Sequence, residues 1–356
     1  MIVNSVKDLT ALRRAEGLEH VEINMSELTA GGIPSYAVKL GIWSLVENGT
    51  LTIKCPYTSS SPAIVPGTIS FNLLCQSLFP AIMPYASLVN LDKENNILIF
   101  RRTASRQKPN KWSFGIIFSG APAEFALLSN CVESIRRQTV FEKDWEIFVC
   151  GPAAAANEVV SKLAVDYVSY ETSSMLDRFD ISSKKNYLMS KLKNSKKLIC
   201  HTRIKLGPTC ISDLPLEFEL ITPSVTIDGP YGKLPYLDLG FIRGVTRNLN
   251  SAKVIPCYYD RRAWISYLAK GIPYIDGGLF CINSNWVKEH KLCEYLAWGE
   301  AEDVEWAQRL NANGFICELS VSAQAFSQTC KMDRYKQFGH LMLYRSLSRL
   351  VNRFFF

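Results

Sequence analysis

The stretch SFGIIFSGAPAEFALLSNCVESIRRQ, residues 113–138, has the pattern of a strand followed by a helix. Residues 113–119 form a continuous apolar run, which is typical of a strand that is buried on both faces of a parallel sheet. Within residues 124–138, Leu127, Cys131 and Ile135 recur every four positions, as on one face of an amphipathic helix. A strand that leads directly into a helix is the repeating unit of an α/β domain.

The same alternation continues along the chain. The pattern predicts strands at 145–151 and 196–201, a helix between them at 183–194, a strand at 274–283 led in by paired glycines, and a helix at 301–315 that Gly314 ends. This order predicts an α/β domain with a doubly wound, mostly parallel sheet. Ligands of such domains bind at the carboxyl ends of the strands.

The segment before this domain has a pattern of its own. Residues 103–112 are polar, basic and broken by Pro109, which indicates a linker. Upstream, the sequence predicts helices at 35–49 and 69–83 and strands at 50–55 and 96–102, hence a small α/β module over residues 1–108 with a packing or docking role. This order resembles the C-terminal half of a class I methyltransferase Rossmann domain. A methyltransferase would need S-adenosylmethionine binding, and the glycine-rich loop for it is absent from these residues.

Length and composition indicate a folded protein with room for two domains. The chain has 356 residues, 47% of them hydrophobic and 21% charged. Its 11 cysteines stand singly among apolar residues, so we expect reduced thiols in the cytoplasm, without disulfides or a zinc site. The first residues lack the apolar core of a signal peptide, and no stretch approaches the ~20 apolar residues of a membrane-spanning helix.

The net charge of +7 is concentrated near the C-terminus. Residues 331–356 are predicted to form a basic amphipathic helix with apolar and arginine faces (Leu343, Leu347, Leu350 and Phe354; Arg345, Arg349 and Arg353). Such a helix suits an anionic membrane surface, here the inner face of the membrane, and equally suits docking on the chain itself or on a partner protein. The basic segments lack the aromatic interleaving of nucleic-acid modules, so no nucleic acid is expected.

Four carboxylates crowd the stretch WGEAEDVEW, residues 298–306. Two interpretations are open from the residues alone. Acidic side chains stabilise a helix N-terminus by a few tenths of a kcal/mol to ~1 kcal/mol each, so the cluster could serve only the start of the helix. Alternatively, one carboxylate is a general base that takes a proton from a bound hydroxyl.

In this order, the segments 114–138, 146–151, 181–186, 197–206, 276–283 and 296–310 resemble a GT-A glycosyltransferase of the family 2 and galactosyltransferase-like kind. The resemblance covers residues 112–330, and WGEAED is its most specific element. It implies transfer of a sugar, with inversion, from a nucleotide-sugar donor to a hydroxyl of a glycan or lipid-linked acceptor. The process implied is bacterial-type synthesis of a surface polysaccharide.

The resemblance also assigns roles near the acceptor. Asp303 would be the catalytic base, and Glu302 would hold the acceptor or orient Asp303. Trp298 would stack on a sugar face, while Gly277 and Gly278 would let the backbone approach the substrate. The remaining two acids of the cluster, Glu300 and Glu305, would be solvated.

On the donor side, Ser119 and Gly120 match the residues that meet the nucleoside. Lys184, Lys185 and Asn186 match the family's segment near the diphosphate, where lysines act as point charges for phosphate. The alternative for these three residues is an ordinary solvated helix start.

The chain departs from the family where a metal would bind. Relatives carry a short acidic Asp-x-Asp-type motif for Mn²⁺ or Mg²⁺, whereas this chain has Cys200, His201, Thr202 and Arg203. Hard divalent ions prefer oxygen ligands, and although His201 is one plausible ligand, a lone histidine would make a poor site, so no metal ligand is assigned. His201 and Arg203 are assigned to donor binding instead. Either Arg203 and nearby lysines replace the metal, or the donor site has decayed. The second case leaves a non-catalytic relative that binds nucleotide sugar or glycan and scaffolds an assembly complex.

Overall fold

The structure is a computed structural model. It describes residues 1–55, 78–105, 111–141, 145–171, 181–229, 232–236, 238–243, 253–256, 261–287, 290–296 and 301–329. The predicted basic helix at 331–356 and Trp298 lie outside these residues.

The larger part of the molecule is built on a nine-stranded sheet. Its order is β8-β7-β6-β9-β16-β11-β17-β10, and β12 pairs with β11. The parallel half consists of β6 (Trp112–Ile117), β7 (Glu146–Gly151), β8 (Asp166–Ser169) and β9 (Lys196–His201). The mixed half consists of β10 (Ile204–Leu206), β11 (Leu220–Gly229), β12 (Gly232–Pro235), β16 (Leu279–Asn283) and β17 (Cys317–Ser327). This largely parallel α/β architecture confirms the predicted fold class.

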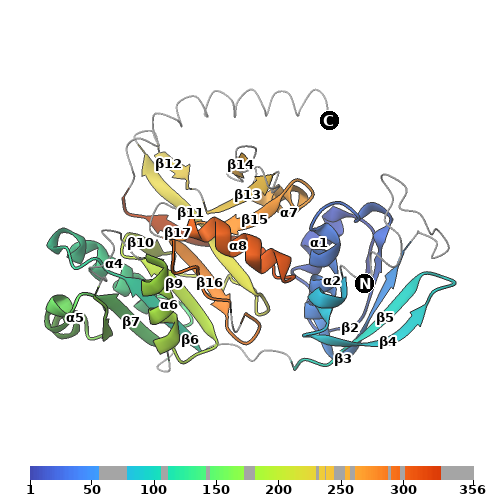
Figure 1. The fold of residues 1–356 in the computed structure, drawn as a ribbon, viewed down its shortest axis with the longest axis horizontal. Helices are drawn as coiled ribbons and strands as arrows, with labels where there is room; N and C mark the ends of the chain where they lie inside the picture. The colour runs from blue at the N-terminus through green and yellow to red at the C-terminus, as the bar shows by residue number, and fades with distance from the viewer. Residues whose placement is uncertain are drawn as a thin grey trace.

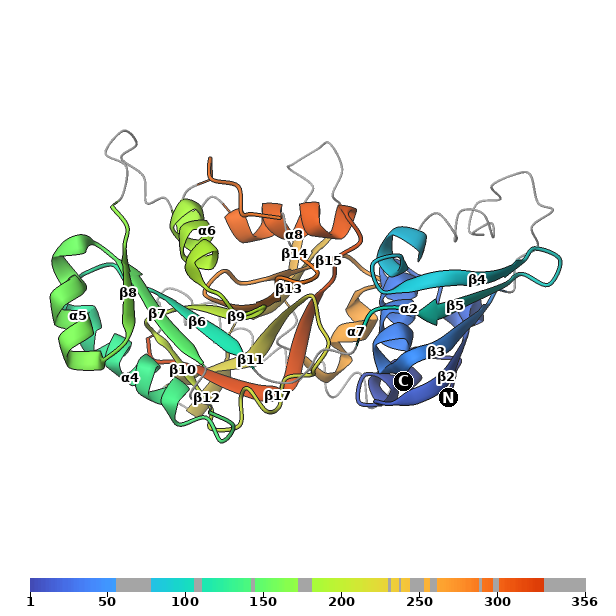
Figure 2. The ribbon, with the colours of Figure 1, turned by 90° about the horizontal axis from the view of Figure 1, so that it is seen from below.

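Helices cover both faces of this sheet (Figures 1 and 2). On one face, α4 (Phe125–Arg136) and α5 (Ala156–Leu163) bury apolar side chains against Phe114, Ile116 and Val149. On the other, α6 (Ile181–Lys191) and α8 (Glu302–Ala312) pack against Ile117, Ile199 and Phe280. A second, three-stranded sheet of β14 (Lys253–Pro256), β13 (Leu239–Arg243) and β15 (Ile272–Ile275) adjoins it, with the short helix α7 (Trp264–Tyr267).

The described residues before Thr103 form a five-stranded sheet with helices beside it, at the other end of the molecule (Figure 1). Strands β1 (Ile2–Val3), β2 (Leu18–Asn24) and β3 (Leu45–Lys54) run parallel, and β5 (Ile97–Arg102) and β4 (Ala86–Asp92) complete the sheet antiparallel to β3 and to each other. Helices α1 (Val6–Leu12) and α2 (Ile33–Ser44) accompany it. We call this part the N-terminal module.

Three sequence predictions need correction. The helix predicted at 35–49 ends at Ser44, because β3 begins at Leu45 and pairs there with β2. The strand predicted at 274–283 is two strands in two sheets, β15 and β16, separated by a turn at Asp276, Gly277 and Gly278. Of the helix predicted at 69–83, residues 78–82 are helical and 69–77 lie outside the described residues.

The N-terminal module and the large sheet share a continuous core and a set of buried ion pairs. One apolar cluster includes Leu40 of α2, Leu220 of β11 and Leu310 of α8. Three buried glutamates of the larger part pair with cations of the module: Lys39 with Glu219 at 2.5 Å, Arg102 with Glu217 at 2.6 Å, and Arg13 with Glu318 at 2.9 Å. We call these six residues the junction network.

Glu219 is the most connected member of this network. Besides Lys39, its carboxylate accepts hydrogen bonds from the Tyr85 hydroxyl at 2.5 Å and from the Ile316 amide at 2.9 Å. Lys39 in turn donates to the carbonyl oxygen of Gly314. Because these partners lie in the module and at both ends of the α8–β17 turn, this one carboxylate fixes several segments at once.

No helix among the described residues is long and apolar enough to span a membrane. The cysteines in the described part of the chain are free thiols, and all of them except the half-buried Cys293 are buried.

We expect Glu219→Gln to lower the free energy of unfolding by roughly 3–5 kcal/mol, because it leaves Lys39 as an uncompensated buried charge. Urea denaturation measures this. Glu22→Gln is the matched control, since Glu22 pairs with Lys54 on the surface, and such pairs contribute up to about 1 kcal/mol. Equal losses in the two variants would contradict the importance of the junction network.

Candidate functional site

The strand order reverses between β6 and β9. From β6 the chain adds β7 and β8 on one side, and it then returns to the other side of β6 to form β9. Ligands of open α/β sheets bind at such a reversal, outside the carboxyl ends of the strands. Ile117 at the end of β6 pairs with His201 at the end of β9, so Ser119, Gly120 and the segment 201–203 lie at this edge.

Ser119 and Gly120 form the turn that follows β6. The Ser119 hydroxyl accepts a hydrogen bond from the Ala121 amide at 3.1 Å. Gly120 has a positive φ of 88°, and a Cβ atom there would lie 2.3 Å from Pro152, so glycine is needed for the turn itself. Their donor-binding role stays a prediction.

Both lysines at the start of α6 are buried, with 4% of Lys184 and none of Lys185 exposed. This excludes the solvated helix start. Lys184 donates to the carbonyl oxygen of Phe118 at 2.6 Å, at the end of β6. Lys185 lies 3.3 Å from the carboxylate of Glu302. Asn186 instead binds segment 292–294 through the backbone of Leu292 and the carboxylate of Glu294.

Asp303 lies against the glycine turn that precedes β16. One of its carboxylate oxygens accepts a hydrogen bond from the Gly277 amide at 3.0 Å, and the other accepts from Val304 at 2.9 Å. A Cβ atom on Gly277 would lie 2.7 Å from the Lys185 Nζ and 3.2 Å from the Glu302 carboxylate. A side chain at 277 would therefore separate the start of α8 from α6, which explains the glycine physically.

The environment of Asp303 raises the pKa of its carboxyl group to about 6. Burial is the largest cause, followed by the nearby carboxylates of Asp276 and Glu302. The hydrogen bond from Gly277 and the charge of Lys185 act in the opposite direction. A carboxylate with this pKa is a stronger base than an ordinary aspartate and is still ionised at neutral pH.

Arg203 reaches the same turn from the other side. Its guanidinium lies 2.7 Å from the His201 Nδ1, 3.4 Å from the Tyr236 hydroxyl and 3.9 Å from the carboxylate of Asp276. A Cβ atom on Gly278 would lie 2.4 Å from this guanidinium. The structure thus brings Lys185, Arg203, Gly277, Gly278, Glu302 and Asp303 of the prediction together around one turn, which we call the candidate site.

Asp276 and Tyr236 also border the candidate site, and neither was predicted from the sequence. Asp276 stands directly before the two glycines, so its position in the sequence was the available signal. Nothing in the sequence around Tyr236 points to Arg203, because their contact depends on the fold of β11 and β12.

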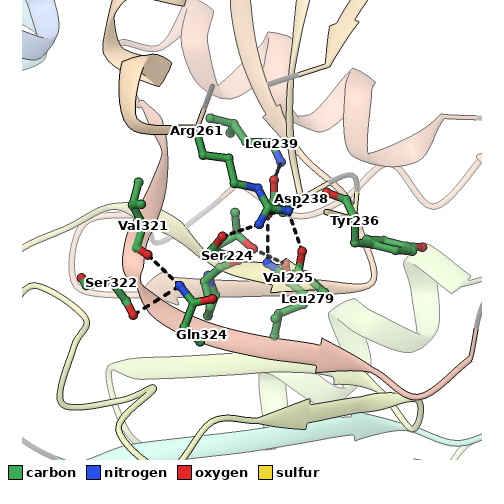
Figure 3. Close-up of polar contacts among 12 residues, drawn as sticks. Ser224, Val225, Tyr236, Asp238, Leu239, Arg261, Leu279, Val321, Ser322 and Gln324 are labelled. Carbon is green, nitrogen blue, oxygen red and sulfur yellow. Dashed lines mark hydrogen bonds and ion pairs between the residues drawn. The ribbon is translucent and has the colours of Figure 1, made fainter. Parts of the chain in front are cut away.

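Arg261 and Asp238 form an ion pair close to this turn (Figure 3). The Arg261 guanidinium pairs with the buried carboxylate of Asp238 at 2.7 Å and donates to the carbonyl oxygen of Tyr236 at 2.9 Å. It also donates to the Ser224 hydroxyl at 2.6 Å, where the pairing of β11 with β17 shifts register. The carbonyl oxygen of Asp238 accepts from the Asp276 amide at 3.0 Å. Arg261 thus connects β11 directly to Tyr236 and, through Asp238, to Asp276.

Of the two remaining acids in residues 298–306, the structure describes Glu305 but not Glu300. Glu300, like Trp298, lies outside the described residues. Glu305 is about one third exposed and pairs with Arg309 at 2.8 Å on the surface of α8, as expected of a solvated side chain.

The described residues at the end of β9 do not fit a divalent cation. Within the described part of the chain, no group of three or more His, Cys, Asp and Glu side chains could hold a metal ion. At this position the guanidinium of Arg203 contacts His201 and would repel a cation.

No protein-family model and no curated protein matches the sequence. Solved structures of glycosyltransferases match part of the chain. TarS residues 1–349 of S. aureus is 12% identical, with a TM-score of 0.41 over 61% of this chain and 60% of that one. GalNAc-T7, crystallised with UDP, GalNAc and Mn²⁺, is 13% identical, with a TM-score of 0.46 over 64% of this chain and 45% of that one. The chain thus spans less than two thirds of the length of either protein.

The raised pKa of Asp303 predicts a pH-dependent effect of Asp303→Asn on stability. The folded state keeps the proton up to about pH 6, whereas the unfolded chain releases it near its ordinary value of ~4, so this carboxyl group costs stability as the pH rises between the two. Relative to the wild type, the variant should gain roughly 1–3 kcal/mol between pH 4 and 7 in urea unfolding. For Glu305→Gln, on the same helix, the free energy of unfolding should change with pH as it does in the wild type. A constant difference for Asp303→Asn would refute the raised pKa.

Proposed function

We propose that this protein is a glycosyltransferase that moves a sugar from a nucleotide-sugar donor to an acceptor hydroxyl, with Asp303 as the general base. The observation that carries the proposal is the carboxylate of Asp303, held by the Gly277 amide at 3.0 Å, with a pKa of about 6, beside the strand ends where an α/β sheet binds ligands. Carboxylates that only stabilised the helix N-terminus through its dipole would need neither the burial of Asp303 nor the glycine turn.

In the proposed reaction, the acceptor oxygen forms a bond to the anomeric carbon of the donor, and the bond from that carbon to the nucleoside diphosphate breaks. Asp303 takes the proton of the acceptor hydroxyl, and the diphosphate leaves with the bonding electrons. Glu302 holds the acceptor or orients Asp303, and its carboxylate lies 3.3 Å from Lys185 in a buried position.

Positive charge for the departing diphosphate comes from Arg203, Lys184 and Lys185 in this proposal. Arg203 is the best placed of the three, because its side chain is about one quarter exposed at the end of β9 while both lysines are buried. A guanidinium offers paired donors that match phosphate oxygens. No step is assigned to a metal ion, because the donor set at the end of β9 does not fit one.

The wider setting is part of the same proposal and rests on the sequence resemblance. It comprises a glycan or lipid-linked acceptor, inversion at the anomeric carbon, and synthesis of a surface polysaccharide at the cytoplasmic face of the membrane. A basic C-terminal helix at 331–356 would supply contact with anionic lipid or a partner protein.

Asp303→Asn should reduce sugar transfer ~10²–10⁴-fold, the usual contribution of a positioned general base. For the wild type, the rate should rise with pH through about 6, as the Asp303 carboxyl group loses its proton. A radiolabelled donor and a glycan acceptor pool provide the assay. Glu305→Gln is the control and should keep full activity. Equal, mild losses in both variants would show that the carboxylates serve only the helix.

Arg203→Ala should weaken nucleoside diphosphate binding roughly tenfold or more, since a hydrogen bond to a charged group contributes ~1.5–3 kcal/mol. Thermal-shift titration with a panel of nucleoside diphosphates and nucleotide sugars, with Mn²⁺ or with EDTA, measures donor and metal dependence together. Arg137→Ala, at the exposed arginine that follows α4, is the control. Binding that requires Mn²⁺ would contradict replacement of the metal by Arg203. Binding without any transfer would favour the non-catalytic scaffold.

A further inference from the structure

A large cavity lies at the junction between the N-terminal module and the large sheet, away from the candidate site. Its volume is about 810 Å³, and its walls come from α1, α2, the turn at 213–215, the region of α7, and β17. Binding sites for small molecules in proteins are typically ~300–1,000 Å³. None of the residues of the candidate site lines this cavity.

Part of the cavity wall is apolar and held rigidly. Tyr36 and Trp264 meet edge to face, with ring centroids 5.2 Å apart, and Ile221 and Leu319 of the adjacent strands line the same space. The hydroxyl of Tyr36 donates to the carboxylate of Glu318 at 2.9 Å. Because these side chains are buried and mutually fixed, the cavity is preformed on this side.

The rest of the cavity wall is polar and rich in arginine. Arg13 is already engaged, since it pairs with Glu318 at 2.9 Å and donates to the carbonyl oxygen of Glu217. Arg14 and Arg262 are exposed, and within the described part of the chain neither guanidinium has an ion pair or hydrogen bond. They come from distant parts of the sequence, yet both line this one cavity.

Hydroxyl and carboxylate groups complete the lining. Thr10, Ser320 and Ser322 contribute hydroxyl groups, and Glu16 and Asp213 contribute carboxylates. Carboxylates accept hydrogen bonds from ligand hydroxyls, while the planar guanidinium donates paired hydrogen bonds to a carboxylate or phosphate. A ligand that carries both hydroxyls and an anionic group would use both kinds of wall.

We propose that this cavity is a second binding site, for a sugar unit that bears a carboxylate or a phosphate, with Arg14 and Arg262 as its anion-binding side chains. The ligand's anionic group contacts the two guanidiniums, and its hydroxyls contact Glu16, Asp213 and the serines. The proposal does not depend on catalysis at Asp303, because the two sites share no residue.

Isothermal titration calorimetry on the full chain tests this, with glucuronate, glucose 6-phosphate, glucose and inorganic phosphate as probes. At least one anionic sugar should bind ten or more times more tightly than glucose and inorganic phosphate. The stronger of the two then identifies carboxylate or phosphate as the preferred group. Arg14→Gln and Arg262→Gln should each weaken this binding about tenfold or more.

Two controls locate the binding. Arg137→Gln, at an arginine just after α4 with 73% of its side chain exposed, should leave affinity unchanged, and so should Arg203→Ala at the candidate site. Because Arg14 and Arg262 are exposed, their variants should keep the wild-type melting temperature. Equal affinity for glucose and both anionic sugars, inorganic phosphate binding as tightly as either sugar, or loss of binding only in Arg203→Ala would overturn the proposal.

Discussion

Three buried glutamates in the larger part of the molecule are paired with cations of the N-terminal module. Glu217 and Glu219 precede β11, Glu318 lies in β17, and each is paired with a module side chain. Leaving one such carboxylate without its partner in a dry interior costs several kcal/mol. The two sheets therefore depend on each other electrostatically as well as through their shared apolar core, and the module cannot be regarded as a loosely attached appendage.

The geometry of the candidate site depends on a second constraint, the space that two glycines leave because they have no side chains. Gly277 and Gly278 leave room for Lys185, Glu302 and Arg203 to approach one backbone turn, and every one of these groups is charged. Burying so many charges requires near-complete pairing. Lys185 pairs with Glu302, and Arg203 approaches Asp276. Burial and the carboxylates of Asp276 and Glu302 raise the pKa of Asp303, against the opposing effects of the Gly277 amide and the charge of Lys185.

Strong periodicity made the central part of the fold predictable. The strand and helix at 113–138 and the strand at 196–201 are found as expected, because their apolar pattern is set by burial alone. Strand β4 was missed because five of its seven residues are exposed, which leaves little apolar alternation. The two strands at 272–283 were predicted as one strand because both are apolar, and only the turn at Gly277 separates them.

For the candidate site, the sequence identified Asp303 and the glycines beside it. It could not reveal that Lys184 is buried, or that Asp276 and Tyr236 flank Arg203, since those facts depend on how distant strands pack.

Helix α8 connects the candidate site to the junction network. Its first turn carries Glu302 and Asp303, while just beyond its last turn Gly314 and Ile316 are held by Lys39 and Glu219 of the junction network. An α-helix of 11 residues is a stiff rod about 16 Å long. Any shift of the module against the large sheet would therefore be transmitted along α8 as a displacement of the Asp303 carboxylate. Through α8, the module thus helps to fix the position of the proposed general base.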